Sequence, residues 1–526
     1  MSLIGCGGGN GGGDGPPPPV VMPSDAFRHG VASGDPLSDA VILWTRVTPP
    51  SEGTVDVEWE IAEDPFFEQS AGGGTVTTDA SRDYTVKVDA TGLRPGRPYY
   101  YRFRAMGGSS LVGRTRTAPT STERFRFAMC SCSRFEDGFY HAYRRIAERN
   151  DLDAVVHLGD YIYEYGGGGT AERPVEPAHE ILTLEDYRTR YATYRRDRDL
   201  QAAHQLHPWI VVWDEHETAN NSYIDGAENH NAGEGDYAER KANAYQAYVE
   251  WLPIREQEPD KLWRTFRFGE LAELIMLDTR RWGRDGPVPD SELADPERQL
   301  LGADQESWLR EQLGTPAQWK ILGQQVMMGQ LTFGSESVLN PDQWDGYPAA
   351  RGRVFDMIES MGLDDVVVLT GDIHTSWAID LARDPFDESM YDEETGRGAL
   401  AVEFVTTSIT SNPDIPFSER LVASVVRSNP HLKFAELNRR GYVLVDVTPE
   451  RTAGEWWLID GIERDQGTQT FAAGWQTRAG ENHLVPAFRP SLERVGPVRP
   501  GFVPEPMGTG GETGEMMAME TEMAGG

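Results

Sequence analysis

The sequence contains little cysteine and comparatively little positive charge. Its 526 residues include 3 cysteines, Cys6, Cys130 and Cys132, which excludes a framework of several disulfides. Cys130 and Cys132 stand too close in the chain to form an unstrained bridge with each other. The 49 lysines and arginines face 84 aspartates and glutamates, which gives a net charge of −35 at pH 7. No nucleic-acid-binding role is expected, because phosphate backbones need a basic protein face.

Long apolar runs, internal repeats and one common zinc motif are also absent from the sequence. No stretch of about 20 apolar residues occurs, so no membrane-spanning helix is predicted. No His-Glu-x-x-His helix occurs, which argues against a zinc peptidase. Hydrophobic residues make up 39% of the chain, enough for a full core, and the length predicts several domains.

The two ends of the chain differ in composition from the rest. Residues 1–23 are rich in glycine and proline and are predicted to be a disordered leader or a lipoprotein-type linker. The run Leu3-Ile4-Gly5-Cys6 is similar to the end of a bacterial lipoprotein signal, in which Cys6 would carry a lipid anchor, although the charged and apolar regions of a full signal are missing. This likeness predicts an exported protein, periplasmic or at the cell surface; a plain flexible leader is the alternative. Residues 489–526 are predicted to be a disordered acidic, Met-rich tail.

Residues 24–118 show the pattern of an all-β domain. An apolar run at 41–44 and alternating apolar and polar residues at 55–59 and 84–88 predict strands, and turn-forming residues separate them. The run Leu93-Arg94-Pro95-Gly96-Arg97-Pro98-Tyr99 resembles the tyrosine corner of fibronectin-type and Ig-like sandwiches, with Tyr99 as the corner residue. We predict a small β-sandwich here, without a catalytic constellation.

Residues 119–488 alternate between short apolar strands and helical stretches, which predicts an α/β domain. Helical spacing of apolar residues occurs at 138–149, 237–251 and 303–313. Strands are predicted at 125–129, 153–158, 209–213, 274–277, 320–322 and 366–369. In such domains the functional site is expected where the strands end.

Metal-competent side chains directly follow four of these strands. The clusters are Cys130-Ser131-Cys132-Ser133, Gly159-Asp160-Tyr161-Ile162-Tyr163-Glu164, Asp214-Glu215-His216-Glu217 with Asn220-Asn221, and Gly371-Asp372-Ile373-His374. A glycine before an aspartate lets the backbone turn sharply while the carboxylate projects at the sheet edge. Each cluster alone would be an ordinary turn, a small buried cysteine or a solvated charge run. All four in one α/β region favour a single metal site.

Cleavage of a phosphoester is chemistry that such a site would suit. The reaction needs a nucleophile opposite the leaving group and neutralisation of spreading negative charge. Two metals about 3.5–4 Å apart provide both, and they lower the pKa of a bound water toward about 7. Metal ions would also supply the local positive charge that so acidic a chain otherwise lacks. Asp160 is our candidate for a carboxylate that bridges the two.

The motifs resemble those of the alkaline phosphatase D group, the PhoD-like phosphatases and phosphodiesterases. The likeness runs in order over nearly all of residues 25–480. The segments that carry it are 27–36, 132–138, 157–164, 213–221, 277–280, 299–309, 371–377 and 403–408. It implies a multi-domain fold, in which an N-terminal sandwich precedes an α/β calcineurin-like metallophosphoesterase sandwich. It also implies an exported enzyme that acts on phosphate monoesters, diesters or both.

The resemblance further implies a binuclear site with ferric iron and calcium. The implied iron ligands are Cys132, Asp160, Tyr163 and His374, a thiolate, phenolate and imidazole set that suits a ferric ion. Asp372 would join Asp160 at the second ion, because Asp-x-His stands where metallophosphoesterases usually carry His-x-His. Oxygen ligands alone would favour calcium there. Among the two cysteines, the spacing to Phe135-Glu136 favours Cys132 over Cys130.

One departure from the family pattern leaves a ligand open. The family usually shows Trp-Asp-Asp-His-Glu, whereas this chain has Trp213-Asp214-Glu215-His216-Glu217. The second-metal ligand is therefore undecided between Asp214, Glu215, and Asn220 or Asn221.

Several further side chains have candidate roles beside the metals. His216 is a candidate acid or transition-state donor, and Arg280 or Arg281 is a candidate phosphate clamp, with a structural ion pair as the alternative. Tyr161, Trp282 and Trp377 are weaker candidates for residues that shape the pocket.

We thus predict an exported metal-dependent phosphoester hydrolase, an alkaline phosphatase or phosphodiesterase that uses metal-activated water. One alternative is a strict phosphodiesterase or a phospholipase D-like lipid headgroup hydrolase. An alternative of another class is a non-catalytic, metal-containing surface binding protein. Substrate preference and oligomeric state stay open.

Overall fold

The structure is a computed structural model of the chain. It describes residues 24–171, 173–256, 258–332, 338–412, 418–464 and 467–501. The predicted disorder of residues 1–23 and 502–526, and the lipid anchor at Cys6, lie outside these residues. Among the described residues, no helix is long and apolar enough to cross a membrane.

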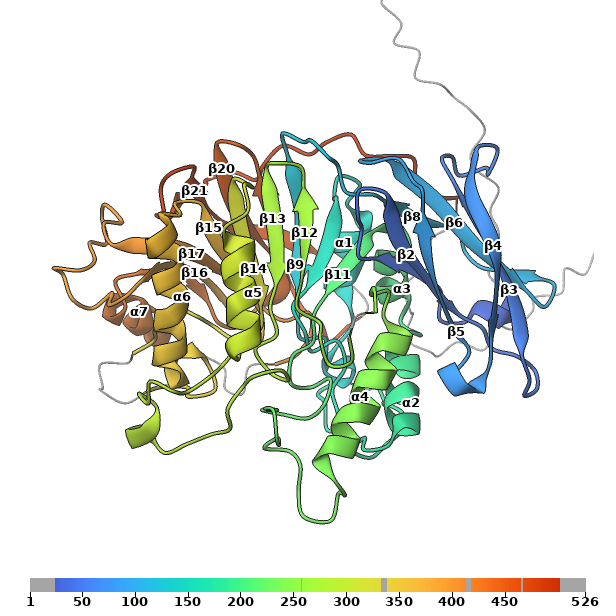
Figure 1. The fold of residues 1–526 in the computed structure, drawn as a ribbon, viewed down its shortest axis with the longest axis horizontal. Coiled ribbons are helices and arrows are strands. Elements are labelled where there is room, and N and C mark those ends of the chain that lie inside the picture. The colour runs from blue at the N-terminus through green and yellow to red at the C-terminus, as the bar shows by residue number, and fades with distance from the viewer. Residues whose placement is uncertain are drawn as a thin grey trace, which may run out of the picture.

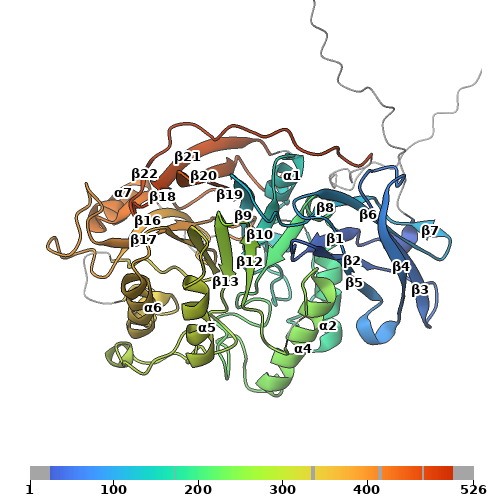
Figure 2. The same cartoon turned by 45° about the horizontal axis from the view of Figure 1, so that its top comes forward.

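The N-terminal part consists almost wholly of strands, shown in blue at one end of the molecule in Figures 1 and 2. They are β1 (Val31–Gly34), β2 (Ala40–Arg46), β3 (Val55–Ala62), β4 (Ser70–Thr78), β5 (Thr85–Thr91), β6 (Pro98–Ala105), β7 (Gly108–Ser109) and β8 (Gly113–Arg116). Strands β3, β4, β6, β7 and β8 form a five-stranded sheet that packs on β1, β2 and β5 through a shared apolar core. Tyr99 lies in this core, and its hydroxyl accepts a hydrogen bond from the Arg94 backbone N–H at 2.8 Å.

The remaining strands build two large sheets that face each other. They are β9 (Phe125–Cys130), β10 (Ala154–His157), β11 (Pro208–Val211), β12 (Arg264–Phe268), β13 (Ala272–Met276), β14 (Trp319–Gln324), β15 (Val366–Thr370), β16 (Ser376–Ala382), β17 (Ala399–Val405), β18 (Leu432–Glu436), β19 (Arg440–Val447), β20 (Arg451–Ile459), β21 (Gln469–Arg478) and β22 (Val485–Pro486). The seven-stranded sheet has the order β12-β13-β14-β15-β17-β16-β18. The ten-stranded sheet has the order β22-β21-β20-β19-β9-β10-β11-β1-β2-β5. Strands β9 to β11 are parallel neighbours, and so are β13 to β15.

Helices cover the outer faces of both sheets. They are α1 (His141–Glu148), α2 (Leu184–Tyr194), α3 (Arg198–Leu206), α4 (Tyr237–Trp251), α5 (Ala303–Leu313), α6 (Pro348–Met361) and α7 (Glu419–Ser428). Helices α1 to α4 pack on the ten-stranded sheet, and α5 and α6 pack on the seven-stranded sheet. The core strands are covered by helices on one face and by the other sheet on the other face. This burial on both faces explains their nearly continuous apolar sequence. In β9, Phe127 and Met129 face the other sheet, whereas Ala128 and Cys130 face the helices.

Most of the predicted elements are present, with small shifts at their ends. The helices predicted at 237–251 and 303–313 have these bounds in the structure, and the one predicted from 138 begins at His141. The N-terminal and core strands lie within three residues of the predicted positions.

The ten-stranded sheet runs without a break from the N-terminal part into the α/β part. Strand β1 pairs in parallel with β11, with Ser33 opposite Pro208 and Gly34 opposite Trp209. At this junction Asp35 forms a two-pronged ion pair with Arg264, with nitrogen–oxygen distances of 2.7 and 3.0 Å. Sequence patterns predict two domains, but not that strands of both would share one sheet.

The predicted disorder of residues 489–526 is wrong for residues 489–501. These residues form an extended segment that runs back toward the N-terminal part. Arg126 donates to the Leu492 carbonyl at 2.8 Å, and Tyr100 donates to the Val498 carbonyl at 2.6 Å. The Arg494 guanidinium bonds Asp153 at 2.8 Å. Composition predicts disorder because this part of the chain is rich in proline and then in Gly, Glu and Met, but several of its backbone carbonyls accept hydrogen bonds from arginine and tyrosine side chains.

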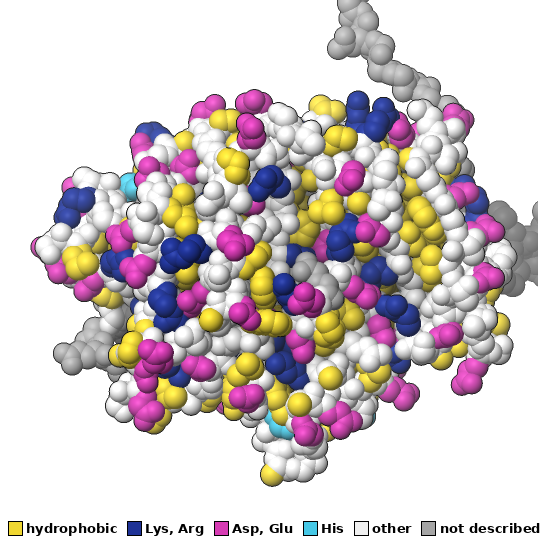
Figure 3. All heavy atoms as spheres, viewed as in Figure 1, with side chains coloured by type: hydrophobic (Ala, Val, Ile, Leu, Met, Phe, Trp, Pro, Cys, Tyr) yellow, Lys and Arg dark blue, Asp and Glu magenta, His cyan; other side chains and the backbone are white. Residues whose placement is uncertain are grey.

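Charges are interspersed on the face of the molecule that Figure 3 shows. Acidic and basic side chains alternate there with apolar patches, and neither sign gathers into one large field on this face.

Candidate active site

The carboxyl ends of both sets of parallel strands point to the same edge of the sheet sandwich. Cys132 follows β9, Asp160 follows β10 and Asp214 follows β11 in one sheet. Arg280 follows β13 and Asp372 follows β15 in the other. A parallel bridge between Ser131 and Ser408 joins the two sheets at this edge. The topology therefore gathers all four clusters that the sequence singled out.

Four of the candidate ligands have an unusual backbone conformation. Cys132, Asp160, Asp372 and His374 have φ values of 58°, 56°, 61° and 58°, in the left-handed region. This conformation costs a non-glycine residue roughly 1–2 kcal/mol. Such strain gathers at functional sites, where it turns side chains toward a common point.

The first ligand group combines a thiol, a carboxylate and an imidazole. One ligand atom each from Cys132, Asp160 and His374 lie within 4.8 Å of one another. The Tyr163 hydroxyl adds a phenolic oxygen, 3.1 Å from Asp160 Oδ2 and 3.2 Å from His374 Nε2. Cys130 instead lies in the helix-facing core, with its sulfur 3.9 Å from the Val156 carbonyl oxygen.

Two residues that no sequence motif singles out hold this first group in place. His374 Nδ1 lies 3.0 Å from the Asn412 carbonyl oxygen, which leaves Nε2 directed at the group. The Ser411 hydroxyl donates to the Tyr163 oxygen at 2.7 Å. Both follow β17 in a loop without a distinctive motif, so pattern reasoning had no signal for them.

The second ligand group consists of carboxylates alone. Oxygen atoms of Asp214, Glu215 and Asp372 lie within 4.8 Å of one another. A further trio of Asp160, Glu215 and His216 meets the same criterion, so Asp160 stands between the two groups. The structure thus places both Asp214 and Glu215 at the second group. The amides of Asn220 and Asn221 bond Glu228 at 3.3 and 2.5 Å.

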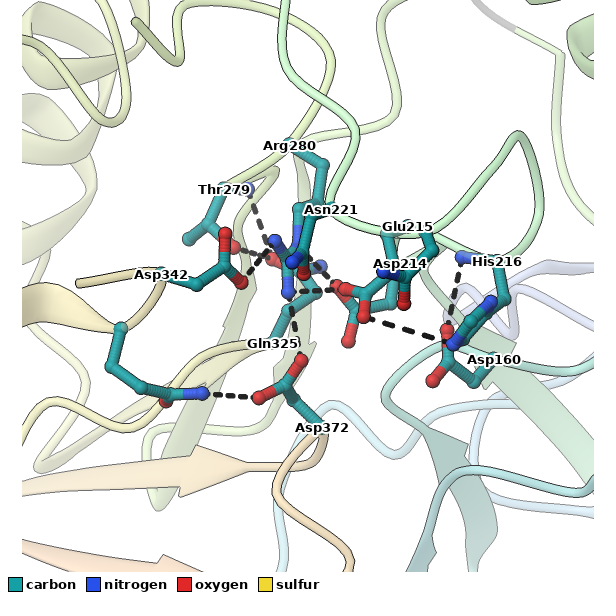
Figure 4. A network of polar contacts seen from close by, with 12 residues as sticks. Asp160, Asp214, Glu215, His216, Asn221, Thr279, Arg280, Gln325, Asp342 and Asp372 are labelled. Atoms are coloured by element: carbon teal, nitrogen blue, oxygen red, sulfur yellow. Dashed lines mark hydrogen bonds and ion pairs between the residues drawn. The ribbon is translucent and has the colours of Figure 1, made fainter. Parts of the chain in front are cut away.

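Arg280 lies fully buried at the centre of the carboxylates (Figure 4). Its guanidinium forms ion pairs with Asp214, Glu215, Asp342 and Asp372. The distances are 2.6 Å to Asp342 and 2.7 Å to Asp372. Asp372 also accepts a hydrogen bond from the Gln343 amide.

Arg280 does not satisfy every oxygen of these carboxylates. Asp214 Oδ2 is buried and has no hydrogen-bond partner among the described residues. A buried carboxylate oxygen without a partner is unfavourable, and a cation at this point would satisfy it. The donor set and this orphaned oxygen therefore fit a bound metal ion.

The pKa values of three candidate ligands are shifted in the direction that favours the uncharged form of each side chain. Burial, followed by the nearby Asp214 carboxylate, raises the pKa of Asp372 to about 6. Burial and the Asp160 carboxylate raise the pKa of the Cys132 thiol well above its usual range. Burial lowers the pKa of His374 to about 3, which keeps its imidazole neutral and able to act as a ligand.

His216 lies between the two ligand groups and the cavity. Its backbone N–H donates to Asp160 at 3.2 Å, and its ring stacks on Tyr163 with 4.1 Å between centroids. Glu164 holds its Nδ1 at 2.6 Å. Burial lowers the pKa of His216, but Glu164 and Asp160 outweigh burial and raise it to about 9. The ring can therefore carry a proton near neutral pH.

Glu217 is a buried carboxylate whose role the sequence did not reveal. It accepts hydrogen bonds from the backbone N–H groups of Asp160 at 3.0 Å, Tyr161 at 2.5 Å and Asp214 at 2.7 Å. This buried side chain thereby fixes the loops after β10 and β11 relative to each other. The Asp-Glu-His-Glu spacing was the available signal, but it does not show which carboxylate faces the metals and which faces the backbone.

An open cavity of about 740 Å³ leads to these groups. The residues that line it include Glu215, His216, Asp372, His374 and Trp377. Three weaker candidates from the sequence do not line it. The Tyr161 hydroxyl meets His204 at 3.0 Å, Trp282 packs on Trp263, and Arg281 bonds Asp260 at 2.7 Å.

Comparisons with known proteins agree with this geometry. The PhoD-like phosphatase family model matches residues 127–456, which include every ligand named above, and the model of the PhoD-like phosphatase N-terminal domain matches residues 18–119. Alkaline phosphatase D of Bacillus subtilis (strain 168) is 41% identical over 461 residues, which cover 82% of this chain and 77% of that protein. A solved structure of PhoD matches with a TM-score of 0.81 and 37% identity, and covers 91% of this chain and 95% of that chain.

The strand-end site and these likenesses define the class of the protein as a phosphoester hydrolase. The chain belongs to the PhoD-like phosphatase family.

Proposed function

We propose that this phosphatase works with a binuclear metal centre in which Asp160 is the shared ligand. The observation that carries the proposal is the position of Asp160, which belongs both to the group with Cys132 and His374 and to the group with Glu215 and His216. Asp160 also adopts a strained backbone conformation that aims its carboxylate between them.

The two ligand groups differ in chemistry, which favours two unlike metals. Cys132, Tyr163 and His374 with Asp160 offer sulfur, phenolic oxygen and nitrogen, a set that suits ferric iron. Asp214, Glu215 and Asp372 with Asp160 offer oxygen alone, which suits calcium. Glu215, where the family usually carries aspartate, reaches the second group through its longer side chain.

Metal ions bound here would neutralise charge on the phosphoryl group and lower the pKa of a water near it. The protein residues provide the rest. His216, held by Glu164 at 2.6 Å, faces the cavity and can donate a proton to the leaving oxygen. Arg280 bonds four carboxylates, so its proposed role is to hold those carboxylates in place and to offset part of their charge.

The finer description of the fold and the location of the protein belong to the same proposal. The Arg94–Tyr99 hydrogen bond supports a fibronectin-type sandwich at the N-terminus. The two facing sheets with helices outside support a calcineurin-like catalytic part. Export to the periplasm or the cell surface rests on the lipoprotein-like sequence around Cys6.

The variant Asp160→Asn tests the proposal. Asparagine has nearly the same shape and tolerates the left-handed backbone, so the fold should persist while the shared ligand is lost. We expect hydrolysis of 4-nitrophenyl phosphate and of bis(4-nitrophenyl) phosphate to fall more than about 100-fold. Asp364→Asn, at an exposed position, is the matched control. Wild-type rates in Asp160→Asn would refute the proposal.

A further inference from the structure

A second cavity adjoins the first on the side of Asp342. It has a volume of about 410 Å³, and Asn221, Glu228, Asn340 and Asp342 line both cavities. The two spaces therefore meet along a common wall. Nothing in the proposed metal chemistry uses the second cavity.

Asp342 also connects the second cavity to the carboxylate group by direct bonds. One of its oxygens pairs with Arg280 at 2.6 Å, and the other pairs with Arg284. The Arg284 guanidinium lies over the Tyr347 ring at 4.9 Å from its centroid. Only the Asp342 carboxylate would thus separate a ligand in the second cavity from Arg280, the arginine that the candidate metal ligands surround.

The walls of the second cavity combine apolar side chains and tyrosine rings with two buried arginines, Arg284 and Arg298, and with the carboxylates of Glu228, Asp285 and Asp342. Tyr223, Val288, Leu293 and Pro341 supply apolar surface. Arg298 lies 4.3 Å from the centroid of the Tyr347 ring and donates to the Gly346 and Gly286 carbonyls at 3.2 and 3.1 Å.

These contacts make the cavity preformed and leave one donor free. The Tyr347 hydroxyl donates to the Asp285 carbonyl at 2.7 Å, which fixes the ring. Arg298 Nη2 makes no hydrogen bond to another residue in the described part of the chain. A preformed cavity that combines apolar surface with a small number of fixed polar groups is typical of a small-molecule site.

We propose that the second cavity is a subsite for one ester group of a phosphodiester substrate. The group it fits is a ring-bearing, largely apolar alcohol with a hydrogen-bond acceptor for Arg298. This inference rests on the proposed function, because the phosphorus atom must lie at the carboxylate groups for the ester to reach past Asp342. A substrate with only a small second ester group leaves this cavity unused.

Two diesters that release the same product test the subsite. Bis(4-nitrophenyl) phosphate carries a second ring, whereas methyl 4-nitrophenyl phosphate carries a methyl group in its place. The measured quantity is the ratio of kcat/KM for the diaryl ester to kcat/KM for the methyl ester. Val288→Trp and Ala227→Phe fill the cavity from two different segments that line it. Leu37→Trp, at an exposed position outside both cavities, is the control.

We expect the ratio to fall about tenfold in each filling variant, the size of effect that a lost pocket contact gives, and to stay at the wild-type value in the control. An unchanged ratio in both filling variants, whether the two kcat/KM values stay the same or fall equally in folded protein, would overturn the subsite while leaving the proposed function intact. Absence of metal-dependent hydrolysis of either diester by the wild-type protein would instead overturn the proposed function.

Discussion

At the scale of single residues, His216 is the side chain whose task the geometry defines best. It is buried, it is held through Nδ1 by Glu164, and it faces the cavity beside Asp160. Its pKa is raised to about 9 by Glu164 and Asp160 against the effect of burial. A protonated ring at this position can supply a proton to a poor leaving group.

Replacing His216 by alanine should therefore affect poor leaving groups most. We expect kcat for phenyl phosphate to fall about 100-fold or more, because an alkoxide or phenoxide of high pKa needs the proton. The decrease for 4-nitrophenyl phosphate should be clearly smaller, because 4-nitrophenolate leaves readily without it. Glu164→Gln should show the same pattern in weaker form. Equal losses with both esters would contradict a role of His216 as the acid for the leaving group.

At the scale of elements, the site depends on close contact between the loops after β10 and β11. Gly159 has φ of 106°, and a Cβ atom there would lie 2.4 Å from the Asp214 Cβ and 2.5 Å from its backbone nitrogen. Any side chain at this position would push the two strand ends apart.

Gly159→Ala should consequently lower both stability and activity. We expect the free energy of unfolding to fall by about 1–3 kcal/mol, from backbone strain together with the clash with Asp214. Gly352→Ala is the matched control, because Gly352 lies in α6 with no atom within 4 Å of an added Cβ. That substitution should raise stability by roughly 0.5–1 kcal/mol. Denaturant unfolding of both variants measures the difference, and a neutral Gly159→Ala would contradict the close contact.

The elements and the ligand clusters could be predicted from the sequence, because apolar strands followed by Gly-Asp or Asp-x-His are local patterns. The hydrogen bonds and ion pairs among the clusters could not be predicted in this way. Arg280 was a candidate phosphate clamp, yet the fold surrounds it with carboxylates, one of which, Asp342, comes from a loop without any motif. Glu164 and Glu217 both belong to the predicted clusters. Only the contacts between the loops show that Glu217 accepts hydrogen bonds from the backbone, whereas Glu164 bonds the His216 ring.

At the scale of the whole molecule, the shared ten-stranded sheet makes the N-terminal part a continuation of the catalytic part. The Asp35–Arg264 pair lies at this junction, with side chains only 1% and 5% exposed. Asp35 also accepts a hydrogen bond from the Arg255 backbone N–H at 2.7 Å. Removing one partner of such a pair leaves the other charge buried and uncompensated.

Asp35→Asn should therefore destabilise the whole protein and not the N-terminal part alone. We expect a loss of about 3–5 kcal/mol in the free energy of unfolding, seen as a single earlier transition by both fluorescence and circular dichroism. Glu176→Gln removes one partner of an exposed pair with Arg196 and should cost at most about 1 kcal/mol. Two separate transitions in either variant would show that the parts unfold independently, despite the shared sheet.

We propose that Asp160 joins two unlike metal sites, and elemental analysis of the purified protein measures both metals at once. We expect iron and calcium together in the wild-type protein, loss of both in Asp160→Asn, and loss of iron with retention of calcium in Cys132→Ser. Fully active protein without either metal, or an Asp160→Asn variant that keeps both, would contradict it.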